Sequence, residues 1–378
     1  MMNTAQFGSL LKELGFDFYS GVPCSYLKSL INFAINECEF VMSNNEGDAV
    51  AIAAGASIGG KKSVVLMQNS GLTNAVSPLT SLIHPFRIPI LGFVSLRGEP
   101  GFPDEPQHEL MGQITPEMLN LMQIKWDYLS SDLDEAKQQL QRANQCIEQN
   151  QPYFFIVKKG TLAQVTLQDK QLNEQKTIPT IKREKVFDDE KPSRYEALQV
   201  ISALRDDNTV HLATTGKLGR ELYDVEDAPN NFYMVGSMGC ISSIGLGLAL
   251  VRREKAIIAL DGDGALLMRM GNLATNGYYS PANLLHILLD NHIHDSTGGQ
   301  FTVSPNVHFV DTAAACGYEQ SIYVHTLEEL TEYIKAWKQH QKLTFLYMKI
   351  AEGSKSGLGR PTIKPFEVKE RLQVFLDD

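Results

Sequence analysis

The sequence predicts an α/β protein that consists of two parallel-sheet units, each covered by helices on both faces of its sheet. Short apolar segments of strand length alternate with segments of helical periodicity along most of the chain, which is typical of such sheets. The length of 378 residues fits about two domains. A polar, charged segment near the middle divides the alternation into two similar halves.

The first half begins with a helix. Thr4 is predicted to cap this helix, whose apolar face carries Phe7 and Leu11. The elements that follow are predicted as strand 16–20, helix 25–36, strand 39–43, helix 46–56, strand 63–68, helix 72–83, strand 88–95, strand 126–129, helix 132–149 and strand 153–157.

The alternation stops at a polar stretch and then resumes. We predict a first domain at 1–165, an exposed linker at 166–192 and a second domain at 193–378. The elements of the second domain are predicted as a helix from Arg194, strand 209–214, helix 217–224, strand 232–235, a Gly-rich helix from 240, strand 256–260, strand 283–289, a helix from 327 and strand 344–350.

Composition narrows the classes of function. The formal net charge of −10 argues against a nucleic-acid or membrane-surface binder, because phosphate backbones attract a basic face. An anionic small molecule stays possible if its binding charges are local. No apolar run is long enough for a membrane span, and the N-terminal residues lack the pattern of a signal peptide. Five scattered cysteines fit a reducing cytoplasm.

The segment ALDGDGALLM, residues 259–268, places an acidic glycine turn after a buried strand. Ligands of open α/β sheets bind beyond the carboxyl ends of strands. A Mg²⁺ ion that bridges Asp263 to phosphate oxygens would explain the carboxylate at this place. The next strand ends at Asn291, with 26 residues between Gly264 and Asn291, and the amide oxygen of Asn291 is expected to reach the same ion. The alternative is a strand-to-helix turn without a ligand.

This spacing resembles the diphosphate-anchoring motif of thiamine-diphosphate enzymes. The resemblance implies the thiamine-diphosphate-binding fold, with a pyrimidine-binding domain followed by a diphosphate-binding domain. It implies that Asp263 and Asn291 bind Mg²⁺ by their side chains and Ile293 by its carbonyl. It also implies cofactor contacts from Gly262, Gly264 and Ala265, with Ala265 lacking the hydroxyl that many members have at its position.

Two further segments fit the same family. In NNEGDAVAIAAGAS, residues 44–57, Glu46 is expected to hydrogen-bond the cofactor's pyrimidine ring as a catalytic acid and base. The alternative is a first-turn residue that interacts with the helix dipole. In VGSMG, residues 235–239, the resemblance gives Gly236 a carbonyl contact and Met238 the role of a wedge under the cofactor. Thr215 and Gly216 are expected to contact the diphosphate.

In this family the cofactor bridges the two kinds of domain across a subunit interface. The resemblance therefore implies a homodimer or a larger homo-oligomer. The predicted linker is far too short for a middle domain, which argues against the large pyruvate decarboxylase and acetolactate synthase types.

Segments 97–115, 260–275, 289–300 and 357–372 resemble the compact two-domain decarboxylases of phosphonopyruvate and sulfopyruvate. The resemblance implies Mg²⁺- and thiamine-diphosphate-dependent decarboxylation of 3-phosphonopyruvate to phosphonoacetaldehyde and CO₂, in phosphonate biosynthesis. Sulfopyruvate decarboxylation, carboligation of a related 2-keto acid and cofactor binding without catalysis remain alternatives.

The loop PDEPQH, residues 103–108, is expected to present Asp104 and His108 at the active edge of the first sheet. With His294 they are candidate catalytic residues, because imidazole can donate to an anion or move protons near neutral pH. Packing at the surface is the alternative for each histidine. Candidate anion ligands, which the sequence does not rank, are Arg97, Lys217, Arg220 and Arg360.

Overall fold

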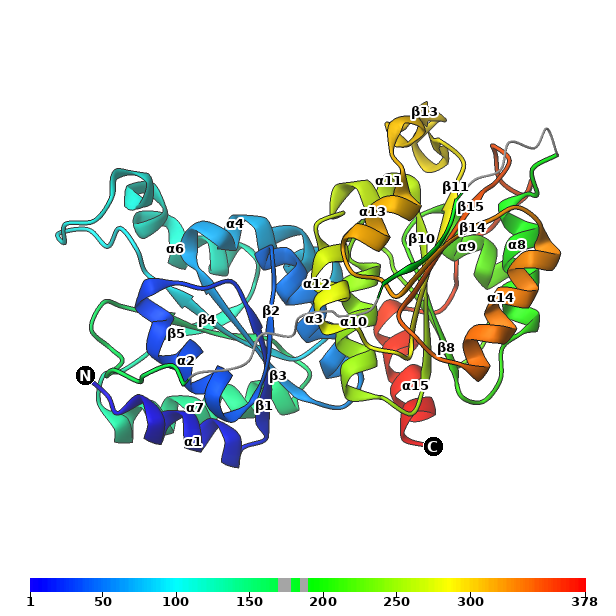
Figure 1. Cartoon of the computed structure of the whole chain (residues 1–378). Helices are drawn as coiled ribbons and strands as arrows, with labels where there is room; N and C mark the ends of the chain where they lie inside the picture. Colours follow the sequence, from blue (N-terminus) through cyan, green and yellow to red (C-terminus); the bar gives the residue numbers. More distant parts are fainter. Residues whose placement is uncertain (169–177, 184–189) are drawn as a thin grey trace. The chain divides into compact units, whose positions relative to one another are not determined.

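The computed structural model describes residues 1–168, 178–183 and 190–378 (Figure 1). The chain forms two compact units, Met1–Leu172 and Asn173–Asp378, and each unit has its own parallel sheet. This confirms the predicted class of two parallel-sheet α/β units. Most of the predicted linker 166–192 lies outside the described residues. No helix in the described ranges has both the length and the apolar character needed to cross a bilayer.

The first unit has a six-stranded sheet in which all neighbouring strands are parallel, in the order β2-β1-β3-β4-β6-β5. Strands β4 and β6 are buried along their whole length, as expected of apolar runs in the centre of a sheet. The strands are β1 (Phe16–Gly21), β2 (Glu39–Met42), β3 (Lys62–Gln68), β4 (Ile90–Ser95), β5 (Lys125–Tyr128) and β6 (Tyr153–Val157).

Helices cover both faces of this sheet. One layer contains α1 (Thr4–Glu13), α2 (Lys28–Glu37) and α7 (Leu133–Glu148). The other layer contains α3 (Glu46–Ile58), α4 (Asn69–Pro78) and α6 (Glu109–Leu121), and α5 (His84–Phe86) is a short turn after α4. Every residue of α3 after its first is buried, because its small side chains allow close packing on β1 and β3.

In this unit one predicted cap was wrong and one helix was missed. The cap of α1 is Asn3, whose side chain accepts a hydrogen bond from the backbone N–H of Gln6. Thr4 is instead the first helical residue, and its hydroxyl donates to the carbonyl of Ala163 at 2.6 Å. Helix α6 was not predicted, because prolines precede it and Pro116 lies inside it.

The second unit has a seven-stranded parallel sheet in the order β7-β14-β15-β11-β10-β8-β9. Strand β7 falls within the predicted linker and was not foreseen. The strands are β7 (Thr180–Lys182), β8 (Thr209–Ala213), β9 (Asn231–Tyr233), β10 (Ala256–Gly262), β11 (Leu284–Asp290), β14 (Gln320–Val324) and β15 (Thr344–Lys349).

The helices of this unit also lie on both faces of its sheet (Figure 1). They are α8 (Arg194–Ala203), α9 (Lys217–Val225), α10 (Ile241–Val251), α11 (Asp263–Met268), α12 (Asn272–Tyr279), α13 (Phe309–Ala315), α14 (Leu327–Gln339) and α15 (Pro365–Asp377). A hairpin of β12 (Ile293–His294) and β13 (Gln300–Phe301) follows β11. Since β8, β10 and β11 are adjacent and parallel, their carboxyl ends share one edge.

Candidate functional site

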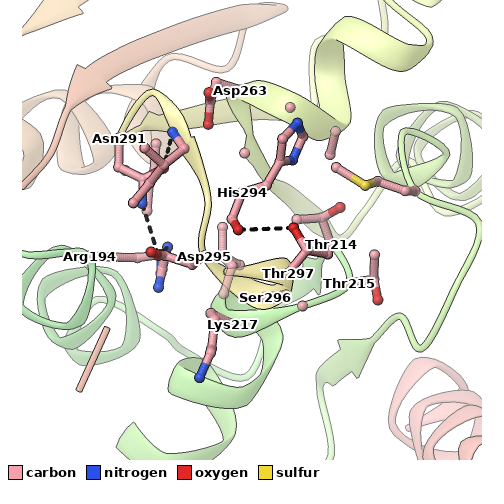
Figure 2. Close-up of a pocket in the computed structure, with 18 residues that line it drawn as sticks. Arg194, Thr214, Thr215, Lys217, Asp263, Asn291, His294, Asp295, Ser296 and Thr297 are labelled. Carbon is pink, nitrogen blue, oxygen red and sulfur yellow. Dashed lines mark hydrogen bonds and ion pairs between the residues drawn. The ribbon is translucent and has the colours of Figure 1, made fainter. Parts of the chain in front are cut away.

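A pocket lies at the edge where β8, β10 and β11 of the second unit end (Figure 2). It brings together most of the site residues that the sequence predicts for this unit. These are Thr215, Gly216, Lys217, Met238, Gly262, Asp263, Gly264, Ala265, Asn291, Ile293 and His294. Gly236, Arg220 and Arg360 are not among the residues that line it.

Asp263 follows β10 directly as the first residue of α11, and only 3% of its surface is exposed. The hydroxyl of Thr302 donates a hydrogen bond to its Oδ2. Burial raises the pKa of Asp263 above its usual value, and the nearby carboxylate of Asp290 raises it further. A divalent cation would offset both effects, so this carboxylate fits a metal ligand.

Asn291 follows β11 at the same edge, and it is 3% exposed. Its Nδ2 donates to Oδ2 of Asp295 at 2.9 Å, and its Oδ1 accepts from the backbone N–H of Ile293 at 3.3 Å (Figure 2). No group of three or more His, Cys, Asp or Glu side chains in the described ranges could hold a metal. The predicted set of one carboxylate, one amide oxygen and one carbonyl would therefore need phosphate oxygens or waters to complete its shell.

Gly264 allows His294 to approach the turn between β10 and α11. A β-carbon at Gly264 would stand 2.4 Å from Cε1 of His294 and 3.3 Å from Cγ2 of Thr302. Any side chain there would push the imidazole ring of His294 away from the turn. The glycine thus keeps the imidazole against the residues that are expected to hold the metal.

The opposite wall of the pocket offers groups suited to an anion. Oγ1 of Thr214 is buried, and it has no hydrogen-bond partner within the part of the chain that the structure describes. Gly216, Lys217 and Leu218 line the pocket where α9 begins, and the free amides of a helix start favour negative charge. An unpaired hydroxyl beside a helix start and a buried carboxylate fits a metal-bound diphosphate.

A second group of predicted residues lies in the first unit, around the start of α4. Glu46 begins α3 after Asn45, whose side chain accepts from the N–H of Gly47 at 2.8 Å. Oε2 of Glu46 accepts from Nδ2 of Asn74 at 2.9 Å, and the carboxyl group lies over Gly71. Two contacts from α4 therefore fix the half-buried carboxyl group.

His108 lies near the same helix start and is 7% exposed. Its Nδ1 is 3.1 Å from Oγ of Ser70 and 3.4 Å from Nε2 of Gln68. Gln68 and Ser70 thus contact His108, while Gly71 and Asn74 of the same helix contact Glu46. The first unit gathers an acid and an imidazole at the carboxyl edge of β3.

Asp104 and Arg97 form a largely buried ion pair that shapes the loop between β4 and α6. Nε of Arg97 donates to Asp104 at 2.7 Å, and the N–H groups of Gly98 and Glu105 donate to it at 2.9 and 2.8 Å. These hydrogen bonds, above all those from Arg97, hold the pKa of Asp104 far below its usual value. The carboxylate is therefore ionised and engaged, and the roles predicted for both residues stay predictions.

Two polar residues of the pocket in the second unit that were not predicted as site residues are Arg194 and Asp295. Arg194 appeared in the sequence only as the start of a helix, and Asp295 only as part of the segment 289–300. The burial of Arg194 depends on Glu221, 27 residues away, which no local pattern indicates. For Asp295, its place four residues after Asn291 was the available signal.

Comparisons with known proteins agree with this geometry. The chain matches two family models, the N-terminal TPP binding domain of thiamine pyrophosphate enzymes at residues 3–117 and their C-terminal TPP binding domain at 214–348. A phosphonopyruvate decarboxylase of Streptomyces viridochromogenes is 39% identical, over 100% of this chain and 95% of that protein. A sulfopyruvate decarboxylase of Methanosarcina acetivorans is 28% identical, over 97% of this chain and 96% of that protein.

Among solved structures, a thiamine-diphosphate-dependent 4-hydroxybenzoylformate decarboxylase of Rhodococcus jostii has a similar fold. Its TM-score is 0.73 at 11% identity, covering 93% of this chain and all of that chain. The predicted pyrimidine-binding and diphosphate-binding order agrees with the order of the two family models. The chain belongs to the thiamine pyrophosphate enzyme family.

Proposed function

We propose that this protein decarboxylates 3-phosphonopyruvate to phosphonoacetaldehyde and CO₂, with thiamine diphosphate and Mg²⁺, in phosphonate biosynthesis. The observation that carries the proposal is 39% identity to a phosphonopyruvate decarboxylase along the whole chain, against 28% to a sulfopyruvate decarboxylase. The scattered cysteines, all five of which are free, support a place in the cytoplasm.

The second unit would hold the cofactor's charged end. Asp263, Asn291 and the carbonyl of Ile293 would bind Mg²⁺, and Thr214 and Gly216 would contact the diphosphate. Support comes from their common pocket and from the unpaired hydroxyl of Thr214. When bound, thiamine diphosphate supplies the electron sink that allows CO₂ to leave a 2-keto acid.

The first unit would supply the acid and base. Glu46 would exchange a proton with the aminopyrimidine ring, and Asn74 keeps one of its carboxylate oxygens hydrogen-bonded. His108 of this unit, or His294 of the second unit, would donate a proton to the reacting carbon or hydrogen-bond the substrate's anionic group. Lys217, which lines the pocket, is the favoured anion ligand over Arg97, Arg220 and Arg360.

The two sets of residues lie in different units, and the complete site would form where the first unit of one subunit meets the second unit of another. A homo-oligomer is therefore part of the proposal. Light scattering should therefore detect a dimer or a larger assembly. When inactive Glu46→Gln subunits are mixed with inactive Asp263→Ala subunits, the mixed oligomers should regain partial activity.

The direct test is release of CO₂ from phosphonopyruvate by the purified protein, with and without thiamine diphosphate and Mg²⁺. We expect turnover only when both are present, and a loss of about a hundredfold or more in kcat for Glu46→Gln. Cofactor binding without turnover, or full activity of the Glu46→Gln variant, would contradict the proposal.

Sulfopyruvate is the second candidate substrate, because a sulfopyruvate decarboxylase matches nearly the whole chain. Comparing kcat/KM for the two acids separates them, and a preference for sulfopyruvate would change the substrate but keep the chemistry. Carbon–carbon products in assays with a second keto acid would instead indicate a carboligase.

A further inference from the structure

We propose that Asp295 is a positioning residue that fixes the side-chain amide of Asn291 with its oxygen available to the metal. Arg194 and Glu221 hold Asp295 in place for this task. The inference rests on the proposed metal and diphosphate site, and it adds residues that do not touch the metal themselves.

The orientation of the Asn291 amide matters because only one of its two ends can bind a cation. Its oxygen has lone pairs to offer, whereas its nitrogen carries two hydrogens and repels a metal. The two ends have nearly the same size, so packing alone does not select between them. Hydrogen bonds must make the selection.

Two hydrogen bonds select the same orientation. Nδ2 of Asn291 donates to the carboxylate of Asp295 at 2.9 Å, and Oδ1 accepts from the N–H of Ile293 at 3.3 Å. A half-turn of the amide would set oxygen against carboxylate and N–H against N–H. The contact with Asp295 is the stronger of the two, because it is shorter and charge-assisted.

Asp295 is itself held by a buried network. Its Oδ2 accepts from Nη1 of Arg194 at 2.9 Å, and Nε of Arg194 donates to Glu221 at 2.7 Å. The side chains of Arg194, Glu221 and Asp295 are 8%, 0% and 10% exposed. Figure 2 shows the side chains of Arg194, Asp295 and Asn291 close together on one side of the pocket.

Arg194 lines the pocket, yet its contacts leave it poorly placed to bind a substrate anion. Its third nitrogen, Nη2, lies 3.4 Å from the carbonyl of Gly353, so each guanidinium nitrogen has a partner. Glu221 is fixed in turn by the N–H of Lys355 at 2.9 Å. The network therefore joins α8, α9 and the loop after β15 behind a single metal ligand, as outer-sphere partners do in metal sites.

The test is a double-mutant cycle with Asp295→Ala and Asn291→Asp. The readout is the Mg²⁺ concentration that half-saturates thiamine diphosphate binding, measured by calorimetry without substrate. In the parent, we expect Asp295→Ala to raise this concentration about tenfold or more. The pair of Arg194 with Glu221 remains in this variant, so the cofactor-free protein should still fold cooperatively, which its unfolding curve checks.

In the Asn291→Asp background we expect the opposite sign. A carboxylate presents oxygen in either orientation, so it needs no positioning, and the carboxylate of Asp295 would repel it. Removing Asp295 there should tighten Mg²⁺ binding. A role of Asp295 in folding alone predicts a loss of the same size in both backgrounds.

The matched control is Asp311→Ala, which removes the same charge from an exposed ion pair with Arg183 in the same unit. It should leave the Mg²⁺ dependence unchanged. An equal loss in both backgrounds, or no loss in the parent, would overturn the inference while the metal site stands. A parent protein that takes up no cofactor with Mg²⁺ would overturn the site and the inference together.

Discussion

The carboxyl group of Glu46 lies so close to the α-carbon of Gly71 that a β-carbon there would stand 2.1 Å from Oε1. Asn74, one helical turn later, donates to the other carboxylate oxygen at 2.9 Å. Helix α4 therefore fixes where this carboxyl group can lie, and Gly71 provides the space for it.

Gly71→Ala should lower activity with little cost in stability. The β-carbon would displace the end of a flexible side chain rather than backbone, so the glutamate can move away. A shift of about 1 Å in a catalytic group can cost about a hundredfold in rate. We expect a large fall in kcat with an almost unchanged melting temperature, and unchanged kcat would contradict the position proposed for Glu46.

Thr214→Val should separate cofactor affinity from stability. Oγ1 of Thr214 is buried without a partner among the described residues, so its removal relieves about 1 kcal/mol or more of desolvation. If this hydroxyl binds the diphosphate, the variant should melt at a higher temperature without cofactor and bind thiamine diphosphate more weakly. Calorimetry of the cofactor-free and the cofactor-bound protein measures the two effects, and unchanged affinity for thiamine diphosphate would contradict the role proposed for this hydroxyl.

Asp104→Asn should destabilise the protein near neutral pH by about 3 kcal/mol, because it leaves Arg97 largely buried without its counterion. The pKa of Asp104 is depressed in the folded state, so its stabilisation is complete above its ordinary value of 3.8 and is lost as pH falls below that value. The difference in unfolding free energy between parent and variant should therefore shrink at acid pH. Denaturant titrations from neutral to acid pH would reveal it.

His211→Leu should make the protein less sensitive to acid. Burial lowers the pKa of His211 to about 3, and the positive charges of Arg205 and Lys338 contribute. Below its ordinary value of 6.5 the unfolded chain binds a proton that the native protein excludes. The free energy of unfolding should fall by up to about 1.4 kcal/mol per pH unit between these values, and the variant should lack this slope. If the free energies of unfolding of the parent and the variant fell in parallel as pH is lowered, the prediction would be contradicted.

That Asp263 and Asn291 line the same pocket was predictable, because one rule places them. Side chains that follow neighbouring parallel strands meet at one edge of the sheet, so Asp263 and Asn291 could be assigned to a common site from spacing alone. The sequence also predicted that Glu46 lies in a different unit from Asp263 and Asn291. The reason is that a polar segment separates two similar alternations of strands and helices.

The supporting residues were not predictable in this way. Arg194 meets Glu221 and Asp295 from 27 and 101 residues away, and their contact depends on how α8 and α9 pack. The residues that flank an arginine in the sequence do not reveal whether its side chain is buried. Helix α6 shows a second limit, because Pro116 lies inside it although proline usually ends a helix, and only burial of its apolar face explains why it forms.

No described strand of one sheet hydrogen-bonds to a strand of the other, and every described strand of the first sheet precedes every strand of the second along the chain. A gene cut within the predicted linker, before β7 begins at Thr180, would thus leave two polypeptides that each keep every described strand of their own sheet. Expressed together, such half-chains should reassemble, and evolution could have encoded the same active site as either one gene or two.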